Sequence, residues 1–204
     1  MTGALTWGLL GSSLAVVVVR RRSTAIVLVA LQSLGLGVYA IAQGSGNAAL
    51  AVAATILFAK ALILPALLLL ATRRARKERL LASEPPALAR LIFAIAVALL
   101  IEQLIPRFGL TTAAVEHAAV GMVALGISIA LVRRAVIFQA LGFLVAENGV
   151  YLAGLSLPGG LPGFIELGLV FDLVVTVSVA AAFATRIHEQ LGSGDTSLLQ
   201  ALRD

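Results

Sequence analysis

The sequence predicts an all-α membrane protein, a polytopic helix bundle of about seven transmembrane helices, because apolar runs repeatedly exceed about 18 residues. The mean hydropathy is +1.06, and 60% of the residues are hydrophobic whereas 12% are charged. Soluble domains have shorter apolar segments that alternate with polar positions. The N-terminus is expected outside and the C-terminus in the cytoplasm, because of how the Lys and Arg residues are distributed.

Seven runs are long enough to cross a bilayer, at about 20 residues per span. In chain order they are Gly3 to Val19, Thr24 to Ala42, Asn47 to Thr72, Ala87 to Ile105, Thr112 to Val132, Ala135 to Leu157 and Gly163 to Thr185. The first run is expected to stay in the mature protein, because no positive residue precedes it and three arginines follow it. Residues 1–110 would then form a four-helix segment, 111–186 a three-helix segment and 187–204 a cytoplasmic tail.

The basic residues indicate the orientation of the bundle. Thirteen of the fifteen Lys and Arg residues fall on one side of the predicted spans, in alternate connections, near span ends and in the tail. The other side has only Arg107, and Lys60 lies within a span. Positive loops stay in the cytoplasm, so this side of the chain is expected to be cytoplasmic. The chain is expected to be a multi-pass protein of the cell inner (cytoplasmic) membrane. The clusters lie beside apolar runs, so the expected partner is the lipid bilayer and not nucleic acid.

The composition narrows the chemistry that this chain can perform by itself. The absence of cysteine excludes disulfides, a thiol nucleophile and cysteine ligation of an iron–sulfur cluster. His117 and His188 are too few and too far apart in sequence for a metal site made by this chain alone. No cofactor or metal site is therefore expected here, and we expect a non-catalytic subunit.

Three ionisable residues, Lys60, Glu147 and Asp172, lie in the interior of predicted spans. At about 1.5 Å rise per residue, Glu147 and Asp172 would be about 14 to 15 Å deep, on consecutive antiparallel helices. Lys60 would lie about 20 Å deep, slightly beyond the midplane. An ionisable group at that depth costs about 2.5 to 3.5 kcal/mol on insertion scales, so such groups are usually retained for a function.

These side chains favour a proton relay. An apolar environment disfavours a charged form and a nearby opposite charge favours it, so groups held between the two effects can exchange protons near neutral pH. The alternative is a permanently neutralised lysine–carboxylate pair, or protonated carboxylates, that only hold helices together.

Other polar residues lie close to this group in sequence. Asn148 follows Glu147 in an otherwise apolar span, and Thr176 lies one turn beyond Asp172 on the same helix face. Glu166 precedes Asp172 by six residues, about 240° around a helix, so it is expected to contact another helix or subunit.

The remaining polar candidates are expected to have more ordinary roles. Glu102, Glu116 and His117 fall near the outer interface, where solvated side chains cost little, although an exit pathway would also use such groups. Gln32 does not titrate and is expected to form interhelical hydrogen bonds.

Several stretches carry a resemblance to a known family. They are "RSTAIVLVALQSLGLG" (Arg22 to Gly37), "KALILP" (Lys60 to Pro65), "LGFLVAENGVYLAGL" (Leu141 to Leu155), "FIELGLVFDLVV" (Phe164 to Val175) and "RIHEQLGSGDTSLLQALRD" (Arg186 to Asp204). Over nearly its whole length the chain resembles hydrogenase-4 component E, the small membrane subunit of formate-hydrogenlyase-type complexes. Its last three spans are similar to subunit K of respiratory complex I and to the equivalent three-helix component of the multisubunit sodium/proton antiporters.

The resemblance also implies site residues. Subunit K has functional carboxylates in its second and third helices, and Glu147 matches the first of them in position and context. The second falls at Thr176, one turn from Asp172. Either Asp172 serves the same face in a shifted register, or the third helix has lost that group.

The resemblance implies a hetero-oligomeric complex with antiporter-like membrane subunits and a peripheral redox arm. Nickel–iron and iron–sulfur centres would belong to partner subunits, and this chain would contribute Glu147, Asp172 and Lys60 to proton or sodium translocation. Two alternatives stay open, namely a subunit of a cation/proton antiporter that has no redox arm, and a structural linker between antiporter-like subunits.

Overall fold

The computed structural model describes residues 2–43, 54–55, 57–58, 60–63, 65–66, 68, 85–106, 109–110 and 112–157. This part of the chain is helical apart from its connections, and it contains no β-strand. The helices are α1 (Thr2–Val18), α2 (Arg22–Gln43), α4 (Ala87–Leu104), α5 (Ala113–Val132) and α6 (Val136–Leu155). The described residues of 54–68 are also helical.

Four of these helices are long and apolar enough to cross a membrane, and α1 is a shorter apolar helix. All five begin and end within two residues of the corresponding predicted run. The predicted span Asn47 to Thr72 is represented by the helical residues of 54–68, whereas Gly163 to Thr185 and the tail lie outside the described residues. The all-helical class is therefore confirmed, with four helices able to cross a membrane, and the full set of seven spans with its orientation stays a prediction.

The helix ends follow local chemistry. Thr112 precedes α5 and its side-chain oxygen accepts a hydrogen bond from Val115 N at 3.3 Å, which satisfies one of the free N–H groups at the helix start. Pro86 precedes α4, where its missing N–H costs nothing. Both helices therefore begin at the residues where their apolar runs begin.

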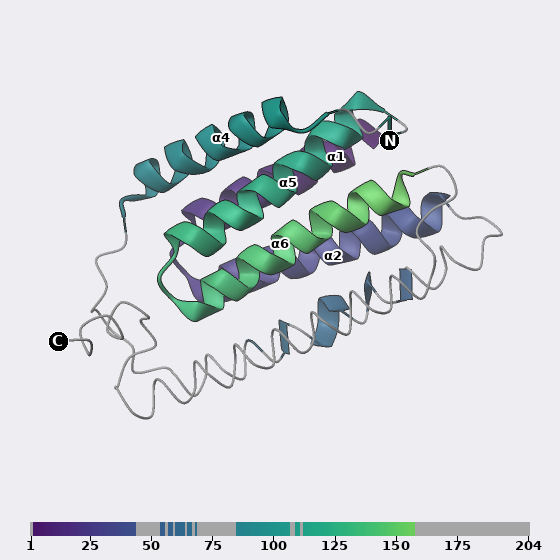
Figure 1. Cartoon of the computed structure of the whole chain (residues 1–204). Helices are drawn as coiled ribbons and strands as arrows, with labels where there is room; N and C mark the ends of the chain where they lie inside the picture. The colour runs from purple at the N-terminus through teal and green to yellow at the C-terminus, as the bar shows by residue number, and fades with distance from the viewer. Residues whose placement is uncertain are drawn as a thin grey trace.

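The helices pack as neighbouring pairs (Figure 1). The longest interface joins α5 to α6, and α5 also contacts α1 and α4. On the other side α6 contacts α2, and α2 contacts α1. The described residues of 54–68 lie beyond α2 and α6, on the side away from α4 (Figure 1). They therefore face the helix that carries Glu147.

Close backbone contact between α5 and α6 depends on glycine. A Cβ atom on Gly126 would lie 2.5 Å from Gly142 O and would also collide with Ala146 N. A Cβ on Gly142 would lie 2.6 Å from Gly126 O, and one on Gly149 would lie 2.7 Å from Ala119 O. Small residues that let helix backbones touch are a usual source of helix association in lipid, where apolar burial gives no driving force.

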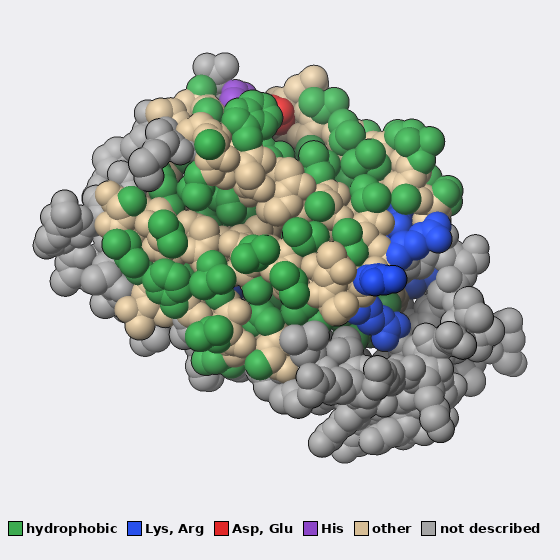
Figure 2. Space-filling view, turned by 180° about the vertical axis from the view of Figure 1, so that it is seen from behind, with side chains coloured by type: hydrophobic (Ala, Val, Ile, Leu, Met, Phe, Trp, Pro, Cys, Tyr) green, Lys and Arg blue, Asp and Glu red, His purple; other side chains and the backbone are tan. Residues whose placement is uncertain are grey.

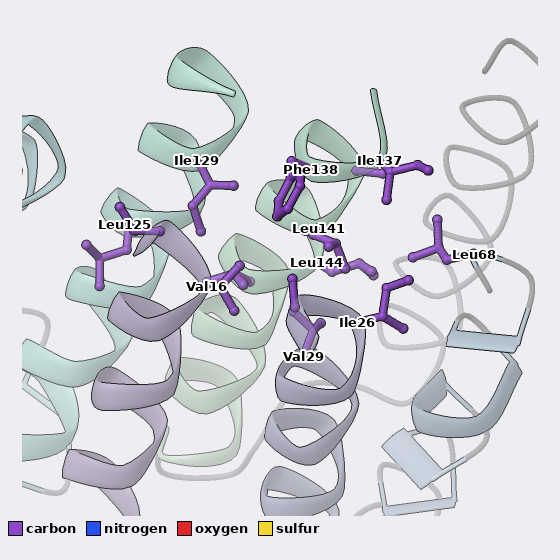
Figure 3. Packing of buried hydrophobic residues seen from close by; sticks show 14 of the residues in the cluster. Val16, Ile26, Val29, Leu68, Leu125, Ile129, Ile137, Phe138, Leu141 and Leu144 are labelled. Atoms are coloured by element: carbon purple, nitrogen blue, oxygen red, sulfur yellow. The ribbon is translucent and has the colours of Figure 1, made fainter. Parts of the chain in front are cut away.

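Apolar side chains from several helices fill the rest of the interior. Figure 3 shows Val16 of α1, Val29 of α2 and Leu141 of α6 packed in one cluster, with Leu68 contributed by residues 54–68. The polar residues of the candidate site lie beside this cluster.

Arginine side chains gather at one end of the bundle, beside a largely hydrophobic surface (Figure 2). Arg90 Nη2 donates to Val18 O at 3.1 Å, and Arg133 Nη1 donates to Val19 O at 3.0 Å. These carbonyls lie at the C-terminal end of α1, where free acceptors and the helix dipole favour cations. The described arginines among the basic residues that the sequence groups on one side therefore share one end of the described bundle.

Candidate functional site

The centre of the candidate site is an ion pair between Lys60 and Glu147. Lys60 Nζ lies 2.8 Å from Glu147 Oε2, and the two side chains are 1% and 10% exposed. Glu147 occupies the middle of α6, and Lys60 approaches it from the helical residues of 54–68. Two residues far apart in the sequence thus place opposite charges in contact inside an apolar bundle.

Two further residues of α6 surround the Lys60 ammonium. Asn148 Oδ1 accepts a hydrogen bond from Lys60 Nζ at 3.1 Å, and the Tyr151 ring centroid lies 5.0 Å from Nζ. Glu147 and Tyr151 are one turn apart and Asn148 is adjacent, so a single stretch of α6 supplies all three contacts. A carboxylate, an amide oxygen and an aromatic face all favour a cation.

Asn148 extends the site to α2 and α1. Its Oδ1 also accepts from Ser33 Oγ at 3.3 Å, and its Nδ2 donates to Gln32 Oε1 at 3.4 Å. Gln32 Nε2 in turn donates to Ser12 Oγ at 2.9 Å and to Ser13 Oγ at 2.8 Å. Both amide side chains are fully buried. A continuous polar network therefore crosses four helical segments at the level of Glu147.

The Glu147 carboxylate keeps acceptor capacity. Oε2 lies at ion-pair distance from Lys60 without the alignment of a hydrogen bond, and Oε1 accepts none from the part of the chain that the structure describes. An ionised carboxylate has about four acceptor positions, so this group can still accept a proton or a water molecule.

A small cavity lies next to the ion pair, between α2, α6 and residues 54–68. Its volume is about 10 Å³, which is close to the minimum for one water molecule. Ser33 and Lys60 are its polar lining, and the other lining residues are Ile26, Val29, Ala30, Pro65, Leu68, Leu141 and Leu144. A single water there would have a hydroxyl and an ammonium as partners.

A second cavity, of about 230 Å³, lies between α4 and the start of α5, and Glu102, Glu116 and His117 contribute to its lining. His117 Nδ1 and Glu102 Oε1 form an ion pair across it when the histidine is protonated, and both side chains are well exposed. Glu116 is only 9% exposed, so the prediction of a solvated surface group is wrong for this residue. The reason is tertiary packing, which places Glu116 at a cavity that Glu102 of α4 also lines.

The remaining predicted site residues, Asp172, Glu166 and Thr176, lie outside the described residues, as does His188. Within the described ranges no three His, Cys, Asp or Glu side chains come together as a metal site would require.

The sequence predicts Gln32 only as a lone interhelical partner and does not single out Ser12, Ser13 or Ser33. The signal from these serines is weak because hydroxyl groups are common in membrane helices, where they bond to their own backbone. The central position of Gln32 follows only from how α1, α2 and α6 face one another.

Comparison with known proteins finds a relative that matches part of the chain. The uncharacterized protein Rv0085 of Mycobacterium tuberculosis (strain H37Rv) is 32% identical to this chain over 96 residues. The match covers 47% of this chain and 43% of that protein, so the chain matches less than half of the relative's length. No protein-family model matches the chain, and no solved structure matches it. The name of the relative assigns no activity.

Proposed function

We propose that this chain is a membrane subunit of a complex I-like energy-converting hydrogenase or a related oxidoreductase, and that it contributes buried ionisable residues to proton or sodium translocation. The observation that carries the proposal is the Lys60–Glu147 pair at 2.8 Å, enclosed in an apolar helix bundle. An ionisable group buried in a membrane protein is by default expected to be functional. Here the partner of Glu147 is Lys60.

The chemistry assigned to the pair is proton exchange at Glu147 next to a fixed positive charge. The Lys60 ammonium offsets part of the cost of an ionised carboxylate in an apolar medium, and the unused acceptor capacity of Glu147 leaves room for a proton. Asp172 is proposed as the next group along the path, with Thr176 and Glu166 as accessory positions. Glu102 and His117 lie toward the opposite end of the bundle from the arginines and would serve as an exit.

The wider assignment rests on the resemblance to hydrogenase-4 component E and subunit K. It proposes seven spans, an outer N-terminus, a cytoplasmic C-terminus and residence in the cell inner membrane. Antiporter-like membrane subunits and a peripheral arm with nickel–iron and iron–sulfur centres would be the partners. Electron transfer would take place in those partners, coupled to ion movement through the membrane part.

The test is Glu147→Gln in the complete complex. Glutamine keeps the shape and hydrogen-bonding capacity of glutamate but cannot exchange a proton. We expect the complex to assemble and the redox arm to keep its electron transfer, while proton movement coupled to that transfer is lost. Proton uptake by reconstituted vesicles, measured beside electron transfer, checks this result. Gln139→Met is the control, because Gln139 lies on the same helix but bonds to Arg133 O, outside the polar network.

Full proton pumping by the assembled Glu147→Gln complex would refute the proposal. An antiporter without a redox arm would give a native complex that contains no stoichiometric nickel and iron, which metal analysis of the purified complex decides.

A structural linker is the other candidate, and the hydrogen bonds that Asn148 and Gln32 make between helices favour it. Under that function, combining Lys60→Met, Glu147→Gln and Asp172→Asn should change stability but leave ion flux unchanged.

A further inference from the structure

The direction of the hydrogen bonds in the polar network is determined from its α1 end. Ser12 Oγ and Ser13 Oγ donate to the same carbonyl, Leu9 O, at 2.8 and 2.9 Å. A serine whose hydrogen bonds to Leu9 O accepts from Gln32, and the opposite amide orientation would place Gln32 Oε1 against Leu9 O, acceptor against acceptor. Gln32 must therefore present its NH₂ group to α1, where Nε2 also lies 3.3 Å from Leu9 O.

The orientation of Gln32 decides the orientation of Asn148. With the NH₂ group of Gln32 on the α1 side, its oxygen faces α6 and accepts from Asn148 Nδ2 at 3.4 Å. Asn148 then turns its own oxygen away from Gln32, toward Lys60 and Ser33. The reversed Asn148 would place its oxygen against the oxygen of Gln32 and its NH₂ against the Lys60 ammonium, so neither contact could form a hydrogen bond.

Lys60 therefore has two acceptors. The Asn148 amide oxygen does not titrate, whereas the Glu147 carboxylate does. The ammonium lies 3.1 Å from Asn148 Oδ1 and 2.8 Å from Glu147 Oε2. Both amides and Lys60 are almost fully enclosed, so the ammonium depends on partners inside the bundle. When Glu147 becomes protonated, Asn148 still holds the ammonium in place.

We propose that Gln32 is a positioning residue that acts through Asn148 to hold the Lys60 ammonium at Glu147. The network is not itself a proton path, since neither amide titrates. Protons that reach Glu147 must therefore arrive by a route other than the two amides. The consequence for transport rests on the proposed function, whereas the geometry of Lys60 does not.

Gln32→Met tests this inference, because methionine approximates the volume of glutamine and removes all its hydrogen bonds. The full chain is prepared in lipid nanodiscs with ¹⁵Nζ-labelled lysine and ¹³C-labelled glutamate and asparagine. The sequence contains two lysines, Lys60 and Lys77, so Lys77→Arg assigns the spectrum. We expect solid-state NMR to detect the Lys60 Nζ couplings to Glu147 Cδ and Asn148 Cγ in the parent chain, and their loss in Gln32→Met.

Two further variants keep the test decisive. Gln139→Met is the matched control on α6, because Gln139 bonds to Arg133 O and takes no part in the network. Its Lys60 couplings should equal those of the parent. If Gln32→Met does not fold, Ser12→Ala with Ser13→Ala removes only two hydroxyls and frees the Gln32 amide to reverse, which should also weaken the Lys60–Asn148 coupling.

Unchanged Lys60 couplings in a folded Gln32→Met chain, or in the double serine variant, would overturn the inference. That outcome leaves the proposed function intact if Glu147→Gln still abolishes proton movement. Conversely, lost couplings together with full pumping by Glu147→Gln would uphold the positioning role and refute the proposed function. A shifted pH profile of transport in Gln32→Met, at unchanged complex assembly, would separate positioning from loss of structure.

Discussion

Gly126→Val is expected to separate α5 from α6 and to destabilise the bundle by about 3 kcal/mol or more, at the upper end of overpacking costs. A side chain at residue 126 meets the α6 backbone at Gly142 O and Ala146 N, and neither atom can move aside as a flexible side chain would. The α5–α6 interface is the most extensive of the described contacts, so the loss extends to the helix that carries Glu147.

Thermal unfolding of the full chain in detergent, with size-exclusion chromatography for monodispersity, measures this effect. Gly8→Val is the matched control, because a Cβ at Gly8 on α1 meets no atom within 4 Å. The control should keep the parent unfolding temperature. A Gly126→Val chain as stable and monodisperse as the Gly8→Val chain would contradict the packing described for α5 and α6.

Lys60→Met is expected to cost about 3 to 5 kcal/mol, the usual penalty for removing one partner of a buried ion pair. It leaves the Glu147 carboxylate enclosed without its cation and leaves Asn148 Oδ1 without its strongest donor. Adding Glu147→Gln should recover most of the loss, because the double variant has no charge left to bury. The two substitutions are thus expected to be strongly non-additive.

A double-mutant cycle on the full chain, with reversible unfolding in mixed micelles, provides the measurement. Glu102→Gln is the comparison, since its side chain is 41% exposed and its replacement should change stability little. If the Lys60 and Glu147 losses simply add, the two side chains do not interact in the folded protein, and the ion pair at the centre of the candidate site does not form.

Much of the fold was predictable because of one constraint. In lipid every backbone N–H and C=O must be paired within the protein, so an apolar run of sufficient length has to become a helix. For this reason α2, α4, α5 and α6 match the predicted runs closely. The arginines near α1 and α5 lie at one end, as their positions beside the runs led us to expect.

The sequence identified ionisable residues of the candidate site, but it did not predict which side chains contact one another. Lys60 and Glu147 were identifiable as ionisable residues inside spans, at expected depths that differed by about one helix turn. The burial of Glu116 and the hydrogen bond between Gln32 and Asn148 depend on contacts between helices, which the sequence does not show.

For the five helices whose ends the structure describes, the sequence by itself determined where they lie, and it also identified the spans that contain a charge. The tertiary structure decided which faces meet, and so brought Lys60 to Glu147 and connected both to the serines of α1. The physical reason is that a helix apolar on every face has no periodic pattern to mark its inner side. Its rotation is set by close contacts such as Gly126 on Gly142, and by the few polar groups that must find partners.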